Sequence, residues 1–209
     1  MAAVIPGVVA TPTRKSATTD SVTIQWTAPT DDGGDPVDDY KVYWDQGNGG
    51  SNFVLLGSSS GQTEFTKTGL SPEGSAYAFK VAPVNYIGDG PLSDPVTVLA
   101  ATEPDQALAP TKTDSTKTTI SIAWTAPDNG GSQITDYAVL LRLENSAGLF
   151  ADITDSGTLD VSARTFTTAS SLTTGESYLF KIVAINAVGP GAESPESDPI
   201  ISAIPPSEP

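Results

Sequence analysis

The strongest constraint on the fold of this 209-residue chain is that its sequence repeats itself. The stretch SVTIQWTAP at 21–29 returns 98 positions later as TISIAWTAP at 119–127. Further along, YAFKV at 77–81 returns as YLFKI at 178–182, and a Gly-Gly pair followed by Tyr-x-Val also occurs in both copies. Blocks repeated in the same order indicate two homologous domains. Each copy has about 100 residues, enough to bury a core without disulfides.

Within each copy the hydrophobic residues recur with a period of two. Val22, Ile24 and Trp26 fall on one face of an extended segment, whereas Thr23 and Gln25 fall on the other. This alternation is typical of strands with one buried face. Seven short strands separated by turn residues predict an all-β fold with two sheets, a seven-stranded Greek-key β-sandwich of the immunoglobulin-like type, in each copy.

The expected boundaries follow from this pattern. Strands are expected near residues 7–12, 21–27, 38–45, 51–57, 62–68, 75–85 and 94–101, and in the second copy near 107–112, 118–124, 135–143, 149–154, 162–169, 177–186 and 197–204. The predicted domains are 1–101 and 107–205, with a linker at 102–106 and the start of a further linker at 206–209.

Composition excludes several classes of function. The chain has no cysteine and no histidine, so the usual ligands of zinc, haem and iron–sulfur clusters are missing, and we expect no cofactor. Imidazole-based catalytic triads are excluded for the same reason. With 25 acidic against 10 basic residues the net charge is −15, which argues against binding nucleic acid. No apolar run reaches the length of about 20 residues that inserts into a membrane.

One acidic loop is the best candidate for chemistry. Asp31, Asp32 and Asp35 crowd a short Gly-containing loop, and Ca²⁺ prefers carboxylate oxygens. The spacing differs from the Asp-x-Asp-x-Asp-Gly loop that ends in glutamate, and the second copy keeps fewer acids. A solvated turn is the favoured interpretation, and the calcium site is the alternative.

The ordered set of aromatic and leucine positions resembles the fibronectin type III domain, twice over nearly the whole chain. Its carriers are a tryptophan followed by Thr-Ala-Pro, a Tyr-x-Val pair, a leucine before a tyrosine, and an Asn-x-x-Gly turn. The resemblance implies core anchors at Trp26, Tyr40, Leu70, Tyr77, Trp124, Tyr137, Leu172 and Tyr178.

Two positions of the first copy depart from the family pattern. Leu70 lies seven residues before Tyr77, whereas Leu172 lies six before Tyr178, so we expect a modified tyrosine corner in the first copy. Pro83 stands in a central strand, where a proline removes a ladder hydrogen bond, and a bulge or an unpaired position is expected there.

Other aromatic and glycine positions are weaker candidates. Trp44 follows the inward phase but ends its strand, so partial exposure and a contact role are open for it. Tyr43 and Tyr86 fall outside the core phase and are candidate binding anchors. The Gly-x-Gly at 88–90 has neither a following helix nor a basic neighbour, which favours a hairpin turn over a phosphate loop.

Seven alternating strands put the two ends of a domain at opposite poles, so the two domains are expected to join end to end. A five-residue linker containing a proline predicts a semi-rigid pair. Arg14 and Lys15 on one side, with Asp128 and Asp136 on the other, are candidates for charged contacts between the domains, each worth less than about 1 kcal/mol.

The favoured function is a structural and interaction module: a non-catalytic, monomeric spacer that contacts a protein or glycan. Its other partners are neighbouring domains, since Ser-Glu-Pro at 207–209 repeats Thr-Glu-Pro at 102–104 where a third domain would begin. The resemblance implies a cell-surface or extracellular location, with a cytoskeletal array as the alternative. A Ca²⁺-stiffened adhesin segment and an accessory domain of a secreted carbohydrate-active enzyme remain open.

Overall fold

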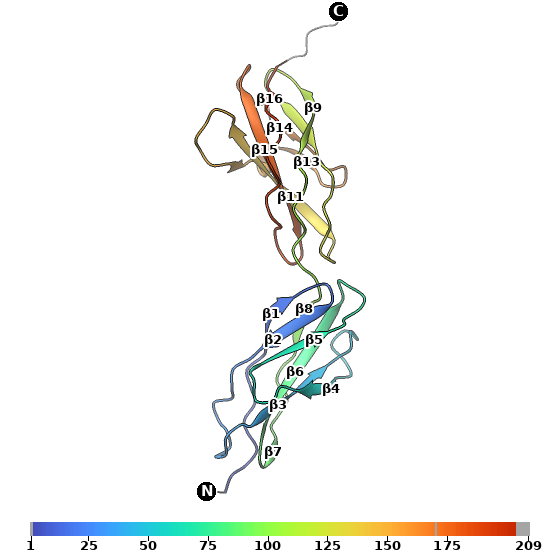
Figure 1. The fold of residues 1–209 in the computed structure, drawn as a ribbon, viewed down its shortest axis with the longest axis vertical. Helices are drawn as coiled ribbons and strands as arrows, with labels where there is room; N and C mark the ends of the chain where they lie inside the picture. The colour runs from blue at the N-terminus through green and yellow to red at the C-terminus, as the bar shows by residue number, and fades with distance from the viewer. Residues whose placement is uncertain (1, 170, 204–209) are drawn as a thin grey trace, which may run out of the picture. The chain divides into compact units, whose positions relative to one another are not determined.

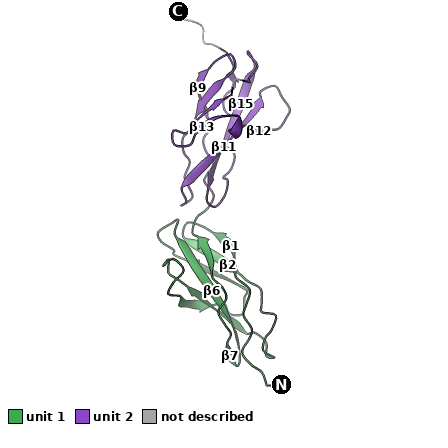
Figure 2. Ribbon diagram, turned by 180° about the vertical axis from the view of Figure 1, so that it is seen from behind, with its two compact units in different colours: residues 1–102 green, residues 103–209 purple. Residues whose placement is uncertain are grey.

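A computed structural model describes residues 2–169 and 171–203 of the chain. The chain divides into two compact units, Met1–Thr102 and Glu103–Pro209, which are coloured separately in Figure 2. Across the described ranges, no helix has the length and apolar character needed to cross a membrane. The further linker expected at 206–209 lies outside the described residues.

The first unit is built from eight strands in two sheets (Figure 1). The strands are β1 (Thr13–Ala17), β2 (Ser21–Gln25), β3 (Asp39–Trp44), β4 (Val54–Ser58), β5 (Glu64–Thr68), β6 (Ala76–Asn85), β7 (Gly88–Asp89) and β8 (Val96–Leu99). One sheet has the order β1-β2-β5 and the other β4-β3-β6, with both β7 and β8 paired to the free side of β6. The last two therefore act as one interrupted edge strand.

The core of the first unit lies between its two sheets. Val22 and Ile24 of β2 and Val42 of β3 are almost fully buried, as the period of two requires. Trp26 packs edge-on against Tyr40, with ring centroids 5.4 Å apart. The anchors Leu70 and Tyr77 belong to the same cluster. Aromatic side chains thus contribute large buried groups to a mainly aliphatic core.

The second unit repeats this plan with one addition. Its strands are β9 (Thr111–Ser115), β10 (Ile120–Ala123), β11 (Ile134–Leu143), β12 (Ala151–Asp152), β13 (Gly157–Asp160), β14 (Thr165–Thr168), β15 (Ser177–Asn186) and β16 (Ile200–Ile201), with a 3₁₀ turn η1 at Thr154–Ser156. The sheets have the orders β13-β14-β10-β9 and β12-β11-β15-β16. After η1 the chain changes sheets, and β13 adds a strand beside β14 that the sequence pattern missed.

The second core reproduces the packing of the first. Trp124 meets Tyr137 edge-on at 5.1 Å between ring centroids, and Leu172 and Tyr178 are buried in the same cluster. Phe166 of β14 is fully buried between the sheets. The two cores are thus closed by equivalent residues within each unit.

The first strand of each unit starts later than expected. Residues 7–12 and 107–112 were expected to be strands, but β1 begins at Thr13 and β9 at Thr111. Pro12 and Pro110 stand immediately before these strands, and a proline has no N–H for the ladder. Val9 is nevertheless buried at 2% exposure, so the irregular segment still covers the first core.

Of the two outcomes expected at Pro83, a bulge or an unpaired position, the structure shows no bulge. Pro83 lies opposite Tyr40 in an unbroken register between β3 and β6. Its carbonyl accepts the N–H of Gly90 at 2.8 Å, on the side of β6 away from β3. The N and O of one strand residue point to the same side, so the missing N–H of Pro83 falls in the gap between β7 and β8.

The two tyrosine corners use opposite hydrogen bonds. The Tyr77 hydroxyl donates to the carbonyl of Ser71 at 3.0 Å. In the second unit the Tyr178 hydroxyl accepts the N–H of Thr173 at 2.9 Å. The extra residue between Leu70 and Tyr77 therefore changes the corner by reversing the role of the hydroxyl.

Candidate functional site

The acidic loop of the first unit uses its carboxylates to hold the backbone. Asp31 Oδ1 accepts the N–H of Gly33 at 2.9 Å, and Asp32 Oδ1 accepts that of Gly34 at 2.8 Å. Asp35 Oδ2 accepts the N–H of Tyr86 at 3.0 Å. Within the described part of the chain, no group of three or more acidic side chains is arranged to hold a metal ion. These contacts fit a turn in which each carboxylate caps nearby N–H groups.

Asn85 is a structural residue whose role the sequence pattern did not reveal. Its Nδ2 donates to the carbonyls of Val4 and Asp32 at 2.8 and 3.0 Å. Its Oδ1 accepts the N–H groups of Ile87 and Gly88 at 3.0 and 3.2 Å. One side chain therefore ties the β6–β7 hairpin to the acidic loop, and the Gly-x-Gly at 88–90 belongs to this hairpin.

Asp45 is a second residue that sequence reasoning missed. Its side chain is buried, and its carboxylate accepts the N–H groups of Gly47, Gly50 and Ala78 at 2.8 to 2.9 Å. Three N–H donors compensate the desolvation of the buried carboxylate. An aspartate just before a Gly-rich stretch is the available signal.

The four residues expected to bear charged contacts between domains all have partners within their own unit. Arg14 donates to the carbonyl of Ala101 at 3.5 Å, and Lys15 forms an ion pair with Glu64. In the second unit Asp128 Oδ1 accepts the N–H of Gly130 at 2.9 Å. Asp136 likewise accepts the N–H that follows it, at 2.8 Å. The interdomain contact stays a prediction.

The three additional aromatic candidates differ in exposure. Tyr86 is 88% exposed, and Tyr43 is half-buried. Trp44 stacks on Tyr77 with ring centroids 6.0 Å apart, and the Lys67 ammonium lies 5.1 Å from its ring centroid. Trp44 thus closes the edge of the first core and is half-exposed beside a cation.

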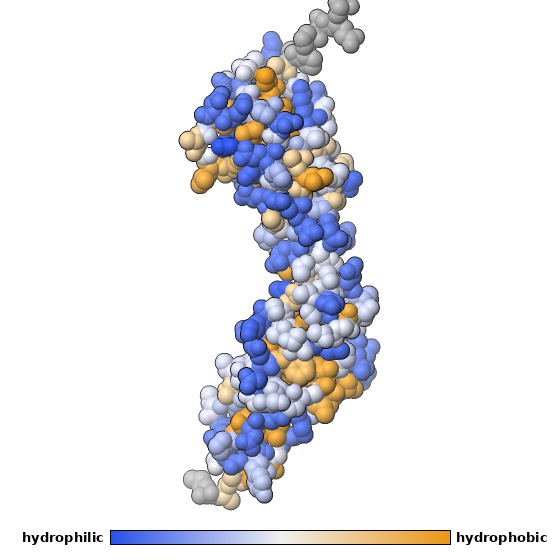
Figure 3. Space-filling view, viewed as in Figure 1, coloured by the Kyte–Doolittle hydropathy of each residue, from blue (hydrophilic) through white to orange (hydrophobic). Residues whose placement is uncertain are grey.

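Apolar side chains gather on the surface of the first unit in the region of β4, the orange area of the lower unit in Figure 3. Val54 and Leu55 of this strand are 40% and 55% exposed. Since β4 is the outermost strand of its sheet, one of its edges is unpaired. Exposed apolar groups beside a free sheet edge are typical of contact surfaces.

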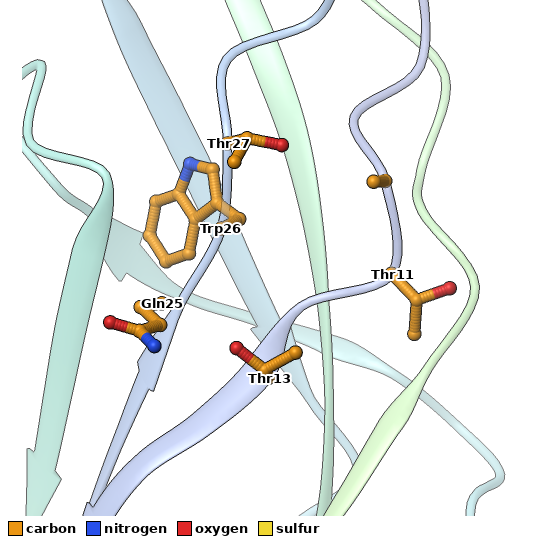
Figure 4. A pocket seen from close by; sticks show the side chains of 6 residues that line it. Thr11, Thr13, Gln25, Trp26 and Thr27 are labelled. Carbon is orange, nitrogen blue, oxygen red and sulfur yellow. The ribbon is translucent and has the colours of Figure 1, made fainter.

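A shallow groove lies beside Trp26 of the first repeat. It is lined by Ala10, Thr11, Thr13, Gln25, Trp26 and Thr27 (Figure 4). The indole N–H of Trp26 is buried without a hydrogen-bond partner. No charged side chain lines this groove, and none of its threonine hydroxyls has a base beside it among the lining residues. The lining therefore provides an apolar surface with hydroxyl groups and does not form a catalytic constellation.

The sandwich topology and paired aromatic anchors define a class, the immunoglobulin-like β-sandwich modules. The family model for the Fibronectin type III domain matches residues 9–99 and 108–200, and the chain belongs to this family with two domains in tandem. The resemblance of the sequence to this family and the all-β fold are both confirmed.

Relatives of the chain are large proteins. It is 32% identical over 187 residues to human (Homo sapiens) Myomesin-2 and 30% identical over 200 residues to Receptor-type tyrosine-protein phosphatase S of Gallus gallus, matching 87% and 94% of this chain. In both cases the match covers 12% of the relative. The chain is also similar in fold to the crystal structure of chicken CNTN1 FN1-FN3 domains. The match covers 97% of this chain and 69% of the CNTN1 chain, with a TM-score of 0.50 and 16% identity.

Proposed function

We propose that this chain is a non-catalytic spacer and contact module of a larger protein at the cell surface or outside the cell. The observation that supports it best is that each unit closes its own core with equivalent aromatic anchors and uses its loop carboxylates to cap backbone N–H groups. We expect such a unit to hold its shape without a ligand. It suits a role in separating neighbouring domains and presenting its faces to a protein or glycan.

The names of the relatives support two locations. The phosphatase relative is named receptor-type, which favours the cell surface. Another relative of Gallus gallus is named M-protein, striated muscle, which favours a cytoskeletal array. We propose the cell surface, with the cytoskeleton as the alternative. An antibody against the tandem should stain intact cells of the source organism. Staining only after permeabilisation would place the protein inside.

Mechanical unfolding tests the spacer role directly. Pulling the tandem between its ends should give two separate unfolding events, one for each closed core. Each event should release roughly 90 residues, or about 30 nm of chain at 3.3–3.6 Å per residue. A single gradual extension without force peaks would show that the units resist no load and would contradict the proposal.

The same measurement separates a plain spacer from a calcium-stiffened segment. If Ca²⁺ bound the native acidic loop, millimolar Ca²⁺ would stabilise the first unit by mass action. We expect equal unfolding forces and thermal midpoints in Ca²⁺ and in chelator. Asp31→Asn/Asp32→Asn is the matched variant, because it removes two carboxylates while keeping oxygen acceptors for the turn. A Ca²⁺-dependent rise that this variant abolishes would favour the adhesin alternative.

A further inference from the structure

The outer face of the β4-β3-β6 sheet in the first unit carries a row of unlike side chains. Leu55, Tyr43 and Lys80 are direct cross-strand neighbours on three adjacent strands. They alternate with residues that pack into the core, so they share the face directed away from it. The Lys80 ammonium lies 4.7 Å from the ring centroid of Phe53, so the row combines apolar, aromatic and cationic groups.

The second unit has the same row with different charges. Asp152, Leu140 and Lys181 occupy the equivalent register positions on β12, β11 and β15. The Lys181 ammonium lies 4.6 Å from the ring centroid of Phe150, which repeats the cation–π contact of the first unit. It also pairs with Glu193 at 3.1 Å. In this unit the cation is neutralised within the chain.

The residue equivalent to Glu193 in the first unit is Leu92. The match is structural, because the next residues, Ser93 and Ser194, make the same contacts: each N–H donates to the strand that carries the lysine, and each hydroxyl accepts an N–H from it. Leu92 is 43% exposed. The first unit therefore has a leucine where the second neutralises its lysine with an acid.

A second acid of the second unit is also replaced by leucine in the first unit, since Leu55 stands where the second unit has Asp152. Among the described residues no carboxylate forms an ion pair with Lys80, although the first unit carries 11 acids and only 5 bases up to residue 101. Arg14 and Lys67 of this unit also have no carboxylate ion pair among the described residues, but Lys80 in addition has leucines where the equivalent positions of the second unit carry acids. Charge depletion around apolar and aromatic groups is what the centres of protein interfaces show.

We propose that the outer β4-β3-β6 face of the first unit binds a protein segment that places one carboxylate against Lys80 and apolar side chains against Leu55 and Leu92. The segment would supply in trans the charge that Glu193 supplies in cis in the second unit. Leu92 on one side of Lys80, and Leu55 beyond Tyr43 on the other, favour a peptide over a glycan. The inference deepens the contact role proposed above, and it names one face and one class of partner.

The test uses the whole tandem and a displayed library of random 12-residue peptides. The library is first depleted on the Leu92→Glu variant, which restores the acid of the second unit, and is then selected on the unaltered chain. Selected peptides should carry Asp or Glu next to apolar residues. Synthetic copies should bind at least tenfold more weakly to Lys80→Gln and to Leu92→Glu, and also when their own acid is replaced by its amide.

Matched variants make the test decisive. Lys181→Gln removes the equivalent lysine of the other unit and should leave peptide affinity unchanged. Lys80→Met keeps an unbranched stem over Phe53 and should bind as weakly as Lys80→Gln, which guards against an effect of altered folding, and thermal melting checks each variant. Failure to enrich any peptide, or equal binding to the Lys80 variants and the unaltered chain, would overturn the proposal.

Two further results would also overturn it. If the tandem forms a dimer in sedimentation velocity and Leu92→Glu dissociates it, the face is occupied by a second copy of the chain. If acidic glycans bind with the same dependence on Lys80 and no peptide does, the partner is a carbohydrate. Two normal unfolding events under force together with a failed selection would leave the spacer role intact and reject only this face.

Discussion

At the scale of single residues, equivalent positions of the two repeats perform different tasks. The Tyr77 hydroxyl donates to a carbonyl, whereas the Tyr178 hydroxyl accepts an N–H. A carbonyl that loses a partner is tolerated better in proteins than an orphaned N–H group. The same Tyr→Phe substitution should therefore have unequal costs in the two units.

We expect Tyr178→Phe to destabilise its unit by about 1–3 kcal/mol, because the Thr173 N–H is left unsatisfied, and Tyr77→Phe by about 1 kcal/mol. Hydrogen exchange followed by mass spectrometry on the intact tandem reports each unit separately. Each substitution also serves as the control for the other unit. Equal losses in protection would contradict the assignment of donor and acceptor.

Gly157 is required by packing and not by its backbone conformation. Its φ of −156° is accessible to any residue, but a Cβ atom there would lie 2.3 Å from Phe166 Cζ and 2.4 Å from the Thr167 carbonyl. Gly157→Ala should therefore cost about 1–3 kcal/mol through overpacking. Gly57→Ala is the matched control, since its Cβ would meet Phe65 at an ordinary 3.4 Å. Urea denaturation should separate the two; similar midpoints would refute the steric argument.

Asp39 gives the first unit a dependence on acid. Partial burial raises the pKa of Asp39, but hydrogen bonds from Ser58 and from the N–H groups of Tyr40 and Gly61 outweigh it, and the pKa lies below its ordinary value of 3.8. A lowered carboxyl pKa stabilises the fold above the unfolded value, and this contribution disappears as pH falls through the folded pKa.

Asp39→Asn should thus weaken the first unit at pH 7 by less than about 1 kcal/mol, a limit set by solvent screening. The difference from the unaltered chain should shrink as pH falls below the ordinary pKa of 3.8 and through the lower folded pKa, because the native carboxyl becomes protonated there. Thermal melting across this range measures it, with Asp38→Asn as the control for loss of charge alone. A difference that stays constant as pH falls below 3.8 would show that hydrogen-bond geometry, not ionisation, is responsible.

At the scale of strands, the loss of stability that a proline causes in β6 depends on which neighbouring strand its backbone nitrogen faces. The backbone nitrogen of Pro83 faces away from β3. The nitrogen of the adjacent Ala82, which lies opposite Lys41, faces β3, because neighbouring residues of a strand direct their N–H groups to opposite sides. Pro83→Ala should change stability by less than about 1 kcal/mol, mainly through the unfolded chain. Ala82→Pro should cost at least about 1 kcal/mol for the lost ladder bond, with ring clashes in addition. Thermal midpoints of the two variants provide the check, and equal shifts would refute the facing deduced for β6.

The strands also show what the sequence can predict. Alternating residues located β2 and β3 closely, because buried and less buried positions alternate along each of them, and β15 was located as well although most of its positions are buried. By contrast β13 was missed, since Gly157–Asp160 pairs at the edge of its sheet and carries only one side chain against the core. The candidate face on β4-β3-β6 could not be predicted either, because register and the equivalence of Leu92 with Glu193 are needed to assemble it.

At the scale of the molecule, the net charge of −15 is shared by both repeats. There are 11 acids and 5 bases up to residue 101, and 14 acids and 5 bases after it. Like charges on one compact surface repel, and salt screens this repulsion. The ion pairs of the described residues are partly exposed and contribute little that salt can remove.

We therefore expect both units to become more stable when NaCl is raised from about 10 to 150 mM, where the Debye length falls from about 30 to 8 Å. A gain of about 0.5 kcal/mol raises a midpoint by a few degrees in domains of this size. The gain should be larger for the more acidic second unit. Sucrose at equal osmolality is the control, and a fall in either midpoint with salt would show that ion pairs dominate.

The buried carboxylate of Asp45 has a consequence for the resistance of the chain to proteolysis. The stretch from Gln46 to Gly50 has the composition of a flexible tether, and four of its five residues have positive φ. Yet it is closed on itself by the one side chain that gathers the N–H groups of Gly47, Gly50 and Ala78. A protease needs an extended, accessible segment, so this loop should survive digestion as long as that carboxylate is in place. The resistance of the most glycine-rich segment of the first unit to protease cleavage thus depends on a single aspartate.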